Sequence, residues 1–336
     1  MHMSDALISP AVAGVMATAS AGLIAYSVYK TKDELEEKKI PLMGVMGAFV
    51  FVAQMINFTI PGTGSSGHIG GGLLLAAILG SAPAFLVMST VLIIQALFFA
   101  DGGILALGCN IFNMGFYACM IAYPLTFKPI MKKGFSKGKI IIASILASVI
   151  GLQLGAFSVV IETLLSGRTE FPFTSFALLM QPIHLAIGIG EGIITAGVLC
   201  FIHSARPEIL EYEVSGKKLG LSINFKKVTI IMVVLAALVG GILSLYASSY
   251  PDGLEWSMGN IIGEEELQAE GETYKKAEDI QKTTSFMPDY NFKNANEDSS
   301  IGTSVAGIIG GAITLIFAFL IGFIISKIKK NKTVMN

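Results

Sequence analysis

The amino-acid sequence predicts an all-α polytopic membrane protein with nine spans, the N-terminus outside the membrane and the C-terminus inside. Of its 336 residues, 53% are hydrophobic and 14% are charged, whereas soluble domains carry about 25% charged residues. A series of apolar stretches is the second observation, and most have the roughly 20 residues that a spanning helix needs. The nine stretches are 9–29, 40–60, 68–80, 83–100, 104–126, 139–165, 174–203, 228–249 and 303–326.

The orientation follows from the basic residues, which accumulate on the cytoplasmic side of membrane proteins. Four segments hold 18 of the 23 basic residues, and all four fall on one side if the chain crosses nine times from an outer N-terminus. The stretch 68–80 is short and is followed by a Gly-Ser-Ala-Pro turn, so we expect a hairpin or a broken helix there. Counting it as a crossing keeps the basic segment 127–139 inside. The four segments are 30–40, 127–139, 204–227 and the tail from 327 to 332.

The chain divides into two predicted domains. Residues 1–203 form a seven-span core, 204–227 a cytoplasmic linker, and 228–336 a two-span segment with the long external loop 250–302. That loop carries 12 acidic residues against four lysines, so it either gathers divalent cations or is a solvated loop that holds open an access path. The net charge of −1 argues against nucleic acid as a partner. The lipid bilayer is the expected environment of the spanning helices.

Two of the four histidines, His2 and His68, are predicted to lie on the outer face. His68 follows the glycine-rich loop 61–67, at the predicted start of a helix. The loop lacks the Gly-Lys-Ser/Thr ending of a P-loop, so we interpret its glycines as allowing close approach of another segment. His203 is expected at the inner end of a helix.

A histidine at position 2 permits a specific metal chelate. The amine of Met1, the backbone nitrogen of His2 and its ring Nδ1 close a five- and a six-membered ring around one ion, and His68 can add a fourth nitrogen. A planar, all-nitrogen site suits Ni(II) or Cu(II), and Co(II) less well, whereas zinc prefers tetrahedral ligands. We expect Met1 to be retained, because histidine is too bulky for removal of the preceding methionine. The alternative is a frayed terminus without function.

His184 and Glu191 lie within the seventh stretch, where ionisable residues are costly. Seven residues separate them, so they share a helix face and are expected to pair. For His184 the expectation is a packing histidine, with a pathway residue as the alternative. For Glu191 it is a structural role, with metal passage or coupling as the alternative.

Four stretches of the first 203 residues resemble the substrate-binding component of energy-coupling-factor nickel/cobalt transporters, the NikM/CbiM type. The second domain resembles the NikN, or PDGLE-type, segment that is a separate chain in some members, through PDGLEW at 251–256 and MPDYNF at 287–292. The four stretches are Met1-His2 with DALISP at 5–10, GTGSSGH at 62–68, FFADGGILALGCNIFNMG at 98–115 and IGIGEGIIT at 187–195.

The resemblance implies that Met1, His2 and His68 hold the metal. It also implies that Asn110, Asn113 and Asp101 shape the site, and a hydrogen bond to the far nitrogen of His68 would be the physical task of such residues.

The implied function is capture of nickel or cobalt at the outer face of a prokaryotic cell membrane, for ATP-driven import. The metal is cargo, and no cofactor is expected. No Walker A or HExxH sequence occurs in the chain, so it is expected not to be an enzyme. Two cytoplasmic ATPase subunits and one transmembrane coupling subunit are the implied partners. The motif does not separate nickel from cobalt, although the fused PDGLE-type segment favours nickel. The alternative is a non-transporting assembly or sensory subunit with an acidic external domain.

Overall fold

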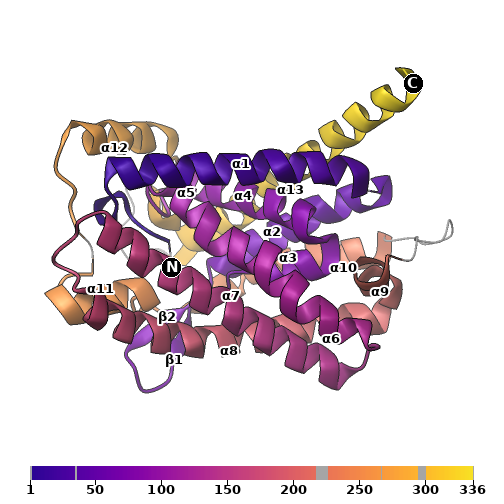
Figure 1. Cartoon of the computed structure of the whole chain (residues 1–336), viewed down its shortest axis with the longest axis horizontal. Coiled ribbons are helices and arrows are strands. Elements are labelled where there is room, and N and C mark those ends of the chain that lie inside the picture. The colour runs from indigo at the N-terminus through magenta and orange to yellow at the C-terminus, as the bar shows by residue number, and fades with distance from the viewer. Residues whose placement is uncertain (1, 35, 217–225, 266, 294–299, 336) are drawn as a thin grey trace.

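A computed structural model describes residues 2–34, 36–216, 226–265, 267–293 and 300–335 of the chain. Long helices run side by side along the longest axis (Figure 1). A small antiparallel hairpin, β1 (Phe58–Ile60) and β2 (Ser65–Gly67), interrupts them. The long helices are α1 (Pro10–Glu34), α2 (Ile40–Gln54), α4 (Ser81–Ile94), α7 (Lys137–Leu165), α8 (Phe173–Ala205), α10 (Lys226–Gly241) and α13 (Ser300–Met335).

Six helices among the described residues are long and apolar enough to cross a membrane, so the protein is a multi-pass membrane protein. The nine predicted spans are therefore not confirmed and stay a prediction. The stretch 40–60 contributes a shorter apolar helix, α2, because the chain leaves it for β1. The stretch 104–126 becomes a helix with π-helical geometry over Ile111–Phe127, between the short α5 (Leu107–Asn110) and α6 (Lys128–Lys132). The six helices are 10–32, 81–99, 137–165, 173–205, 228–246 and 301–329.

The broken helix expected after residue 68 is confirmed. Helix α3 (Gly72–Leu79) ends at Gly80, whose φ of 91° is a backbone conformation that glycine adopts at little cost, and α4 starts directly after it. Eight residues make a helix about 12 Å long, which is too short to cross alone. All residues of α3 are buried. The loop that carries His68 therefore lies at the start of a half-length helix inside the bundle.

The two ends of the bundle are formed by different elements. At one end Gly80 lies against Glu213 of α9 (Pro207–Ser215), which also pairs with Lys39 at the start of α2. The other end holds α11 (Gly253–Ile262), α12 (Glu272–Thr284) and the hairpin (Figure 1). Which end faces the cytoplasm stays a prediction from the basic residues.

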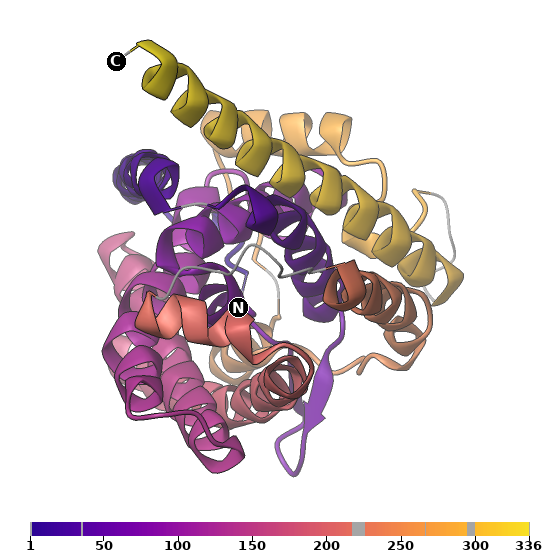
Figure 2. The same cartoon turned by 90° about the vertical axis from the view of Figure 1, so that its right-hand side faces the viewer.

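The second domain packs on the first along α2 and α13. Gly44 and Gly47 of α2 let α13 approach so closely that an added Cβ at Gly44 would lie 2.7 Å from the Leu315 carbonyl oxygen. Viewed from the end that holds α9, α13 crosses one side of the bundle, and the start of the chain lies near the middle (Figure 2). The N-terminal segment is thus enclosed by helices of both domains.

Candidate metal site

The N-terminal segment is inserted into the bundle and held through the backbone of Met3. Met3 is fully buried. Its N–H donates to Oδ1 of Asn110 at 2.7 Å, and its carbonyl accepts from Nδ2 of Asn110 at 3.1 Å and from the Gly103 N–H at 3.0 Å. Gly103 lies in the loop before α5, and Asn110 is the last residue of α5. The glycine-rich run at 98–115 therefore binds the start of the chain.

Asp5 fixes the same segment one turn further on. Its carboxylate accepts from the N–H of Ala106 at 3.0 Å, and a side chain at Gly103 would overlap it. Burial raises the pKa of Asp5, opposed by the hydrogen bonds from the backbone N–H groups of residues 104–106. A glycine at position 103 is thus required for the N-terminal segment to insert into the bundle.

His2 and His68 are brought together inside this enclosure. Their rings are stacked, with centroids 5.2 Å apart and an interplanar angle of 23°. Nδ1 of His68 lies 3.1 Å from the Ile69 carbonyl, and Nε2 of His2 lies 3.2 Å from Oε1 of Gln95. A carbonyl oxygen can only accept, so Nδ1 of His68 carries the proton and its lone pair is on Nε2. His2 has an acceptor beside each ring nitrogen, because the Asp101 carboxylate lies 3.3 Å from its Nδ1, so these contacts do not select its tautomer.

Burial favours the neutral form of both imidazoles. Burial lowers the pKa of His68 to about 3. Burial also lowers the pKa of His2, although the negative charge of Asp101 acts in the opposite direction. A neutral ring is the form that binds a metal.

Two glutamines connect the histidines, and sequence reasoning missed both. Nε2 of Gln95 donates to Oε1 of Gln54 at 2.8 Å, and Nε2 of Gln54 donates to the carbonyl of Gly70 at 2.7 Å. This chain of amides runs from the ring of His2 to the backbone beside His68, and it orients the oxygen of Gln95. An amide inside an apolar stretch is the signal that could have found them.

The residues predicted to shape the site have different tasks from the one expected. Oδ1 of Asp101 lies 3.3 Å from Nδ1 of His2, and its Oδ2 accepts from the hydroxyl of Tyr290. Asn110 holds Met3, and Nδ2 of Asn113 donates to Glu162 at 2.8 Å. The predicted hydrogen bond from an asparagine to His68 is wrong, because Nδ1 of His68 already donates to the backbone carbonyl of Ile69.

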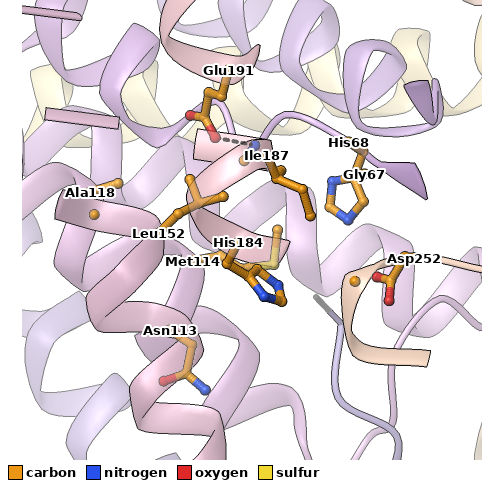
Figure 3. A pocket seen from close by; sticks show the side chains of 13 residues that line it. Gly67, His68, Asn113, Met114, Ala118, Leu152, His184, Ile187, Glu191 and Asp252 are labelled. Carbon is orange, nitrogen blue, oxygen red and sulfur yellow. Dashed lines mark hydrogen bonds between the residues drawn. The ribbon is translucent and has the colours of Figure 1, made fainter. Parts of the chain in front are cut away.

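Glu191 does not pair with His184, contrary to the expectation. Its carboxylate accepts from the backbone N–H groups of Gly70 and Gly71 at 2.8 and 3.1 Å, directly before α3 (Figure 3). Nδ1 of His184 donates instead to the carbonyl of Met180 at 2.8 Å. Glu191 thereby holds the loop that carries His68, a task its place in the sequence did not show.

The site opens into a large acidic cavity that both domains line. About 790 Å³ of this cavity is open to the centres of water molecules. Within the described part of the chain its lining contains no lysine or arginine, so the cavity attracts cations. The lining includes seven carboxylates, which belong to Asp5, Asp101, Asp252, Glu255, Glu265, Glu278 and Asp289.

Side chains alone do not make a metal centre here. Among the residues that the structure describes, no three His, Cys, Asp or Glu side chains could hold one ion together. A site at His2 and His68 therefore needs backbone or terminal nitrogen, as the chelate hypothesis supposes. Met1, the predicted source of the amine, lies outside the described residues.

Comparison with known proteins assigns both halves of the chain. Residues 2–209 match the family described as the cobalt uptake substrate-specific transmembrane region, CbiM, and residues 226–327 match the PDGLE domain. A putative fused nickel transport protein NikMN of Archaeoglobus fulgidus is 32% identical over 95% of this chain and 97% of its own length. The cobalt transport protein CbiM of Sorangium cellulosum is 30% identical over 56% of this chain and 84% of its own.

A solved structure agrees with these matches. The crystal structure of a truncated transition metal transporter is 30% identical, has a TM-score of 0.55, and covers 61% of this chain and 99% of its own length. The chain belongs to the CbiM family of substrate-specific transmembrane proteins and carries a PDGLE domain fused to its C-terminal side.

Proposed function

We propose that this protein captures Ni²⁺ or Co²⁺ at the outer membrane face and delivers it for ATP-driven import. It acts as the substrate-specific component of an energy-coupling-factor transporter. A transmembrane coupling subunit and two cytoplasmic ATPases supply the energy, so this chain has no catalytic step of its own. The ion is cargo rather than a resident cofactor.

One observation carries the proposal: two histidines from distant parts of the chain lie stacked beside a cation-attracting cavity, with ring centroids 5.2 Å apart. The Ile69 carbonyl places the lone pair of His68 on Nε2, and the chelate uses Nδ1 of His2 and Nε2 of His68. With the amine of Met1 and the backbone nitrogen of His2 they complete a four-nitrogen set, which suits Ni²⁺. Asp101 faces Nδ1 of His2 at 3.3 Å, so this contact rearranges when the ion binds.

The acidic cavity supplies the route to the site. Its carboxylates come largely from the PDGLE domain, and hard oxygen ligands bind nickel less tightly than nitrogen does. They therefore concentrate hydrated cations without retaining them. This role explains why an acidic external segment accompanies a nitrogen site in one chain.

The relatives support a transport role and do not decide the metal. The Archaeoglobus relative is named for nickel, and the Sorangium relative for cobalt. The fused PDGLE domain is present in the match to the nickel protein. We therefore propose nickel as the preferred cargo and cobalt as the second.

The test is calorimetric binding of Ni²⁺ and Co²⁺ to the full chain, compared with a variant that has one residue added before Met1. Extension and His68→Ala should each abolish stoichiometric binding. His203→Ala is the matched control, because His203 stacks on Phe135 away from the site. Unchanged affinity in the extended chain would refute the chelate. Tight binding without metal uptake in cells that contain the whole complex would favour a sensory subunit.

A further inference from the structure

A second, smaller cavity lies beyond His68, further inside the bundle. About 20 Å³ of it is open to the centres of water molecules, which is room for roughly one water or one ion. His68 and Asp252 line both cavities, so they form the boundary between them. We call this space the inner chamber. Its other walls come from α7, α8 and the π-helical segment (Figure 3).

His184 presents an unpartnered nitrogen in this chamber. The ring is 1% exposed, and its Nδ1–H donates to the carbonyl of Met180, so the lone pair is on Nε2. Among the described residues Nε2 has no hydrogen-bond partner. A buried acceptor without a partner is costly, and it fits a ligand that visits the chamber.

The chamber offers a second type of donor beside the imidazole. Met114 lines the same space (Figure 3), and its thioether favours soft or borderline metals over Ca²⁺ or Mg²⁺. The Asp252 carboxylate adds negative charge at the boundary. Gly253 closes one wall so tightly that an added Cβ would lie 3.1 Å from Cε1 of His184. The PDGLE domain thus packs directly on this histidine.

We propose that the inner chamber is a second binding position for the cargo cation, with Nε2 of His184 as its principal ligand. The ion occupies it after it leaves His68 on the way inward. The inference rests on the proposed function and adds a transit site to it. An ion that left its nitrogen ligands for an apolar interior would be unsolvated, which is prohibitive. The imidazole of His184, in the chamber next to His68, allows the ion to exchange one nitrogen ligand for another without that cost.

His184→Asn separates the ligand role from a structural one. The amide nitrogen of asparagine can replace Nδ1 as the donor to Met180, but nothing replaces Nε2. We expect Ni²⁺ affinity of the purified full chain to stay within about threefold. Uptake by the whole complex should fall about tenfold or more, a loss typical of weakened metal sites. His203→Asn is the matched control and should leave uptake unchanged.

His184→Cys tests the chemistry of the donor. A thiolate in the chamber binds soft cations, so this variant should regain part of the uptake and become sensitive to inhibition by Cd²⁺. A purely structural histidine predicts no such sensitivity, and its absence would count against the transit site. If His184→Asn does not fold, Met114→Leu provides the same comparison, because it keeps the side-chain volume and removes the sulfur.

Three results would overturn the transit site. One is uptake by His184→Asn within about twofold of the unsubstituted protein at equal membrane abundance. A second is unchanged uptake by Met114→Leu, where this variant is used because His184→Asn does not fold. The third is a large loss of Ni²⁺ affinity in His184→Asn, because His184 would then act through the outer site. Failure of the proposed function is distinguishable, since the unsubstituted protein would neither bind nor import the metal.

Discussion

Substitution of Asn110 by alanine tests whether the inserted terminus is what makes the site. The change removes two hydrogen bonds to Met3. The Met3 N–H, which is fully buried, loses its partner, at a cost of about 1–3 kcal/mol. The Met3 carbonyl keeps the N–H of Gly103 at 3.0 Å, so the second bond costs only about 0.5–1.5 kcal/mol. The inserted state therefore loses about 1.5–4.5 kcal/mol.

This loss converts to a weakening of nickel binding by about 10- to 2,000-fold. The full factor appears in the apparent Kd once the withdrawn terminus is the major form, because only the inserted form binds. If the inserted form is more stable than the withdrawn form by more than this loss, it remains the major form after the substitution. The change then appears as a lower unfolding temperature of the metal-free protein. Calorimetric titration and thermal unfolding in detergent are therefore measured together.

The matched control is Asn260→Ala, which deletes an exposed amide on α11 that donates to the carbonyl of Trp256. It should change neither quantity. An Asn110→Ala protein with wild-type affinity and wild-type unfolding temperature would refute the reasoning, since the Met3 contacts would then contribute nothing to the site.

Three further changes are predicted to act through other parts of the site. Glu191→Gln should weaken Ni²⁺ binding by about 10-fold or more and lower the unfolding temperature, because an amide cannot accept from both N–H groups of the His68 loop; equal binding titrations would contradict this. Gly253→Ala should lower uptake, because the new Cβ would lie 2.9 Å from a side chain of α8, whereas Gly259→Ala meets nothing closer than 3.4 Å and serves as the control. Joint substitution of Glu265 and Glu278 by glutamine should slow metal association at low ionic strength, and stopped-flow rates should converge at high salt; a difference that persists in salt would exclude steering.

The sequence was sufficient to predict that His2 and His68 meet, because that prediction needs only topology. The basic segments place both residues at the same end of the bundle, and a glycine-rich loop before His68 permits close approach. The family resemblance, confirmed by the comparisons, covers the same residues. None of these signals depends on the details of side-chain packing.

The supporting contacts could not be predicted, because each joins segments far apart in the chain. The sequence does not show whether an amide in an apolar stretch faces lipid, the core or a ligand. The contacts of Gln54 and Gln95 could therefore not be predicted. The helix α3 is apolar on every side because it is buried on every side, and such a pattern resembles a full span. Asp252 reads as an ordinary helix cap, which it also is.

A single helix, α8, holds both the anchor of the His68 loop and the nitrogen of the inner chamber. Seven residues separate Glu191 from His184, which is about 10.5 Å along the helix axis. A displacement of α8 along its axis therefore cannot loosen the outer ligand without moving the inner one by the same amount. The packing of Gly192 on the backbone of Ile145 in α7 extends this linkage to a helix pair. Mechanical force applied to that pair from the end that holds α9 would act on both proposed positions of the ion at the same time.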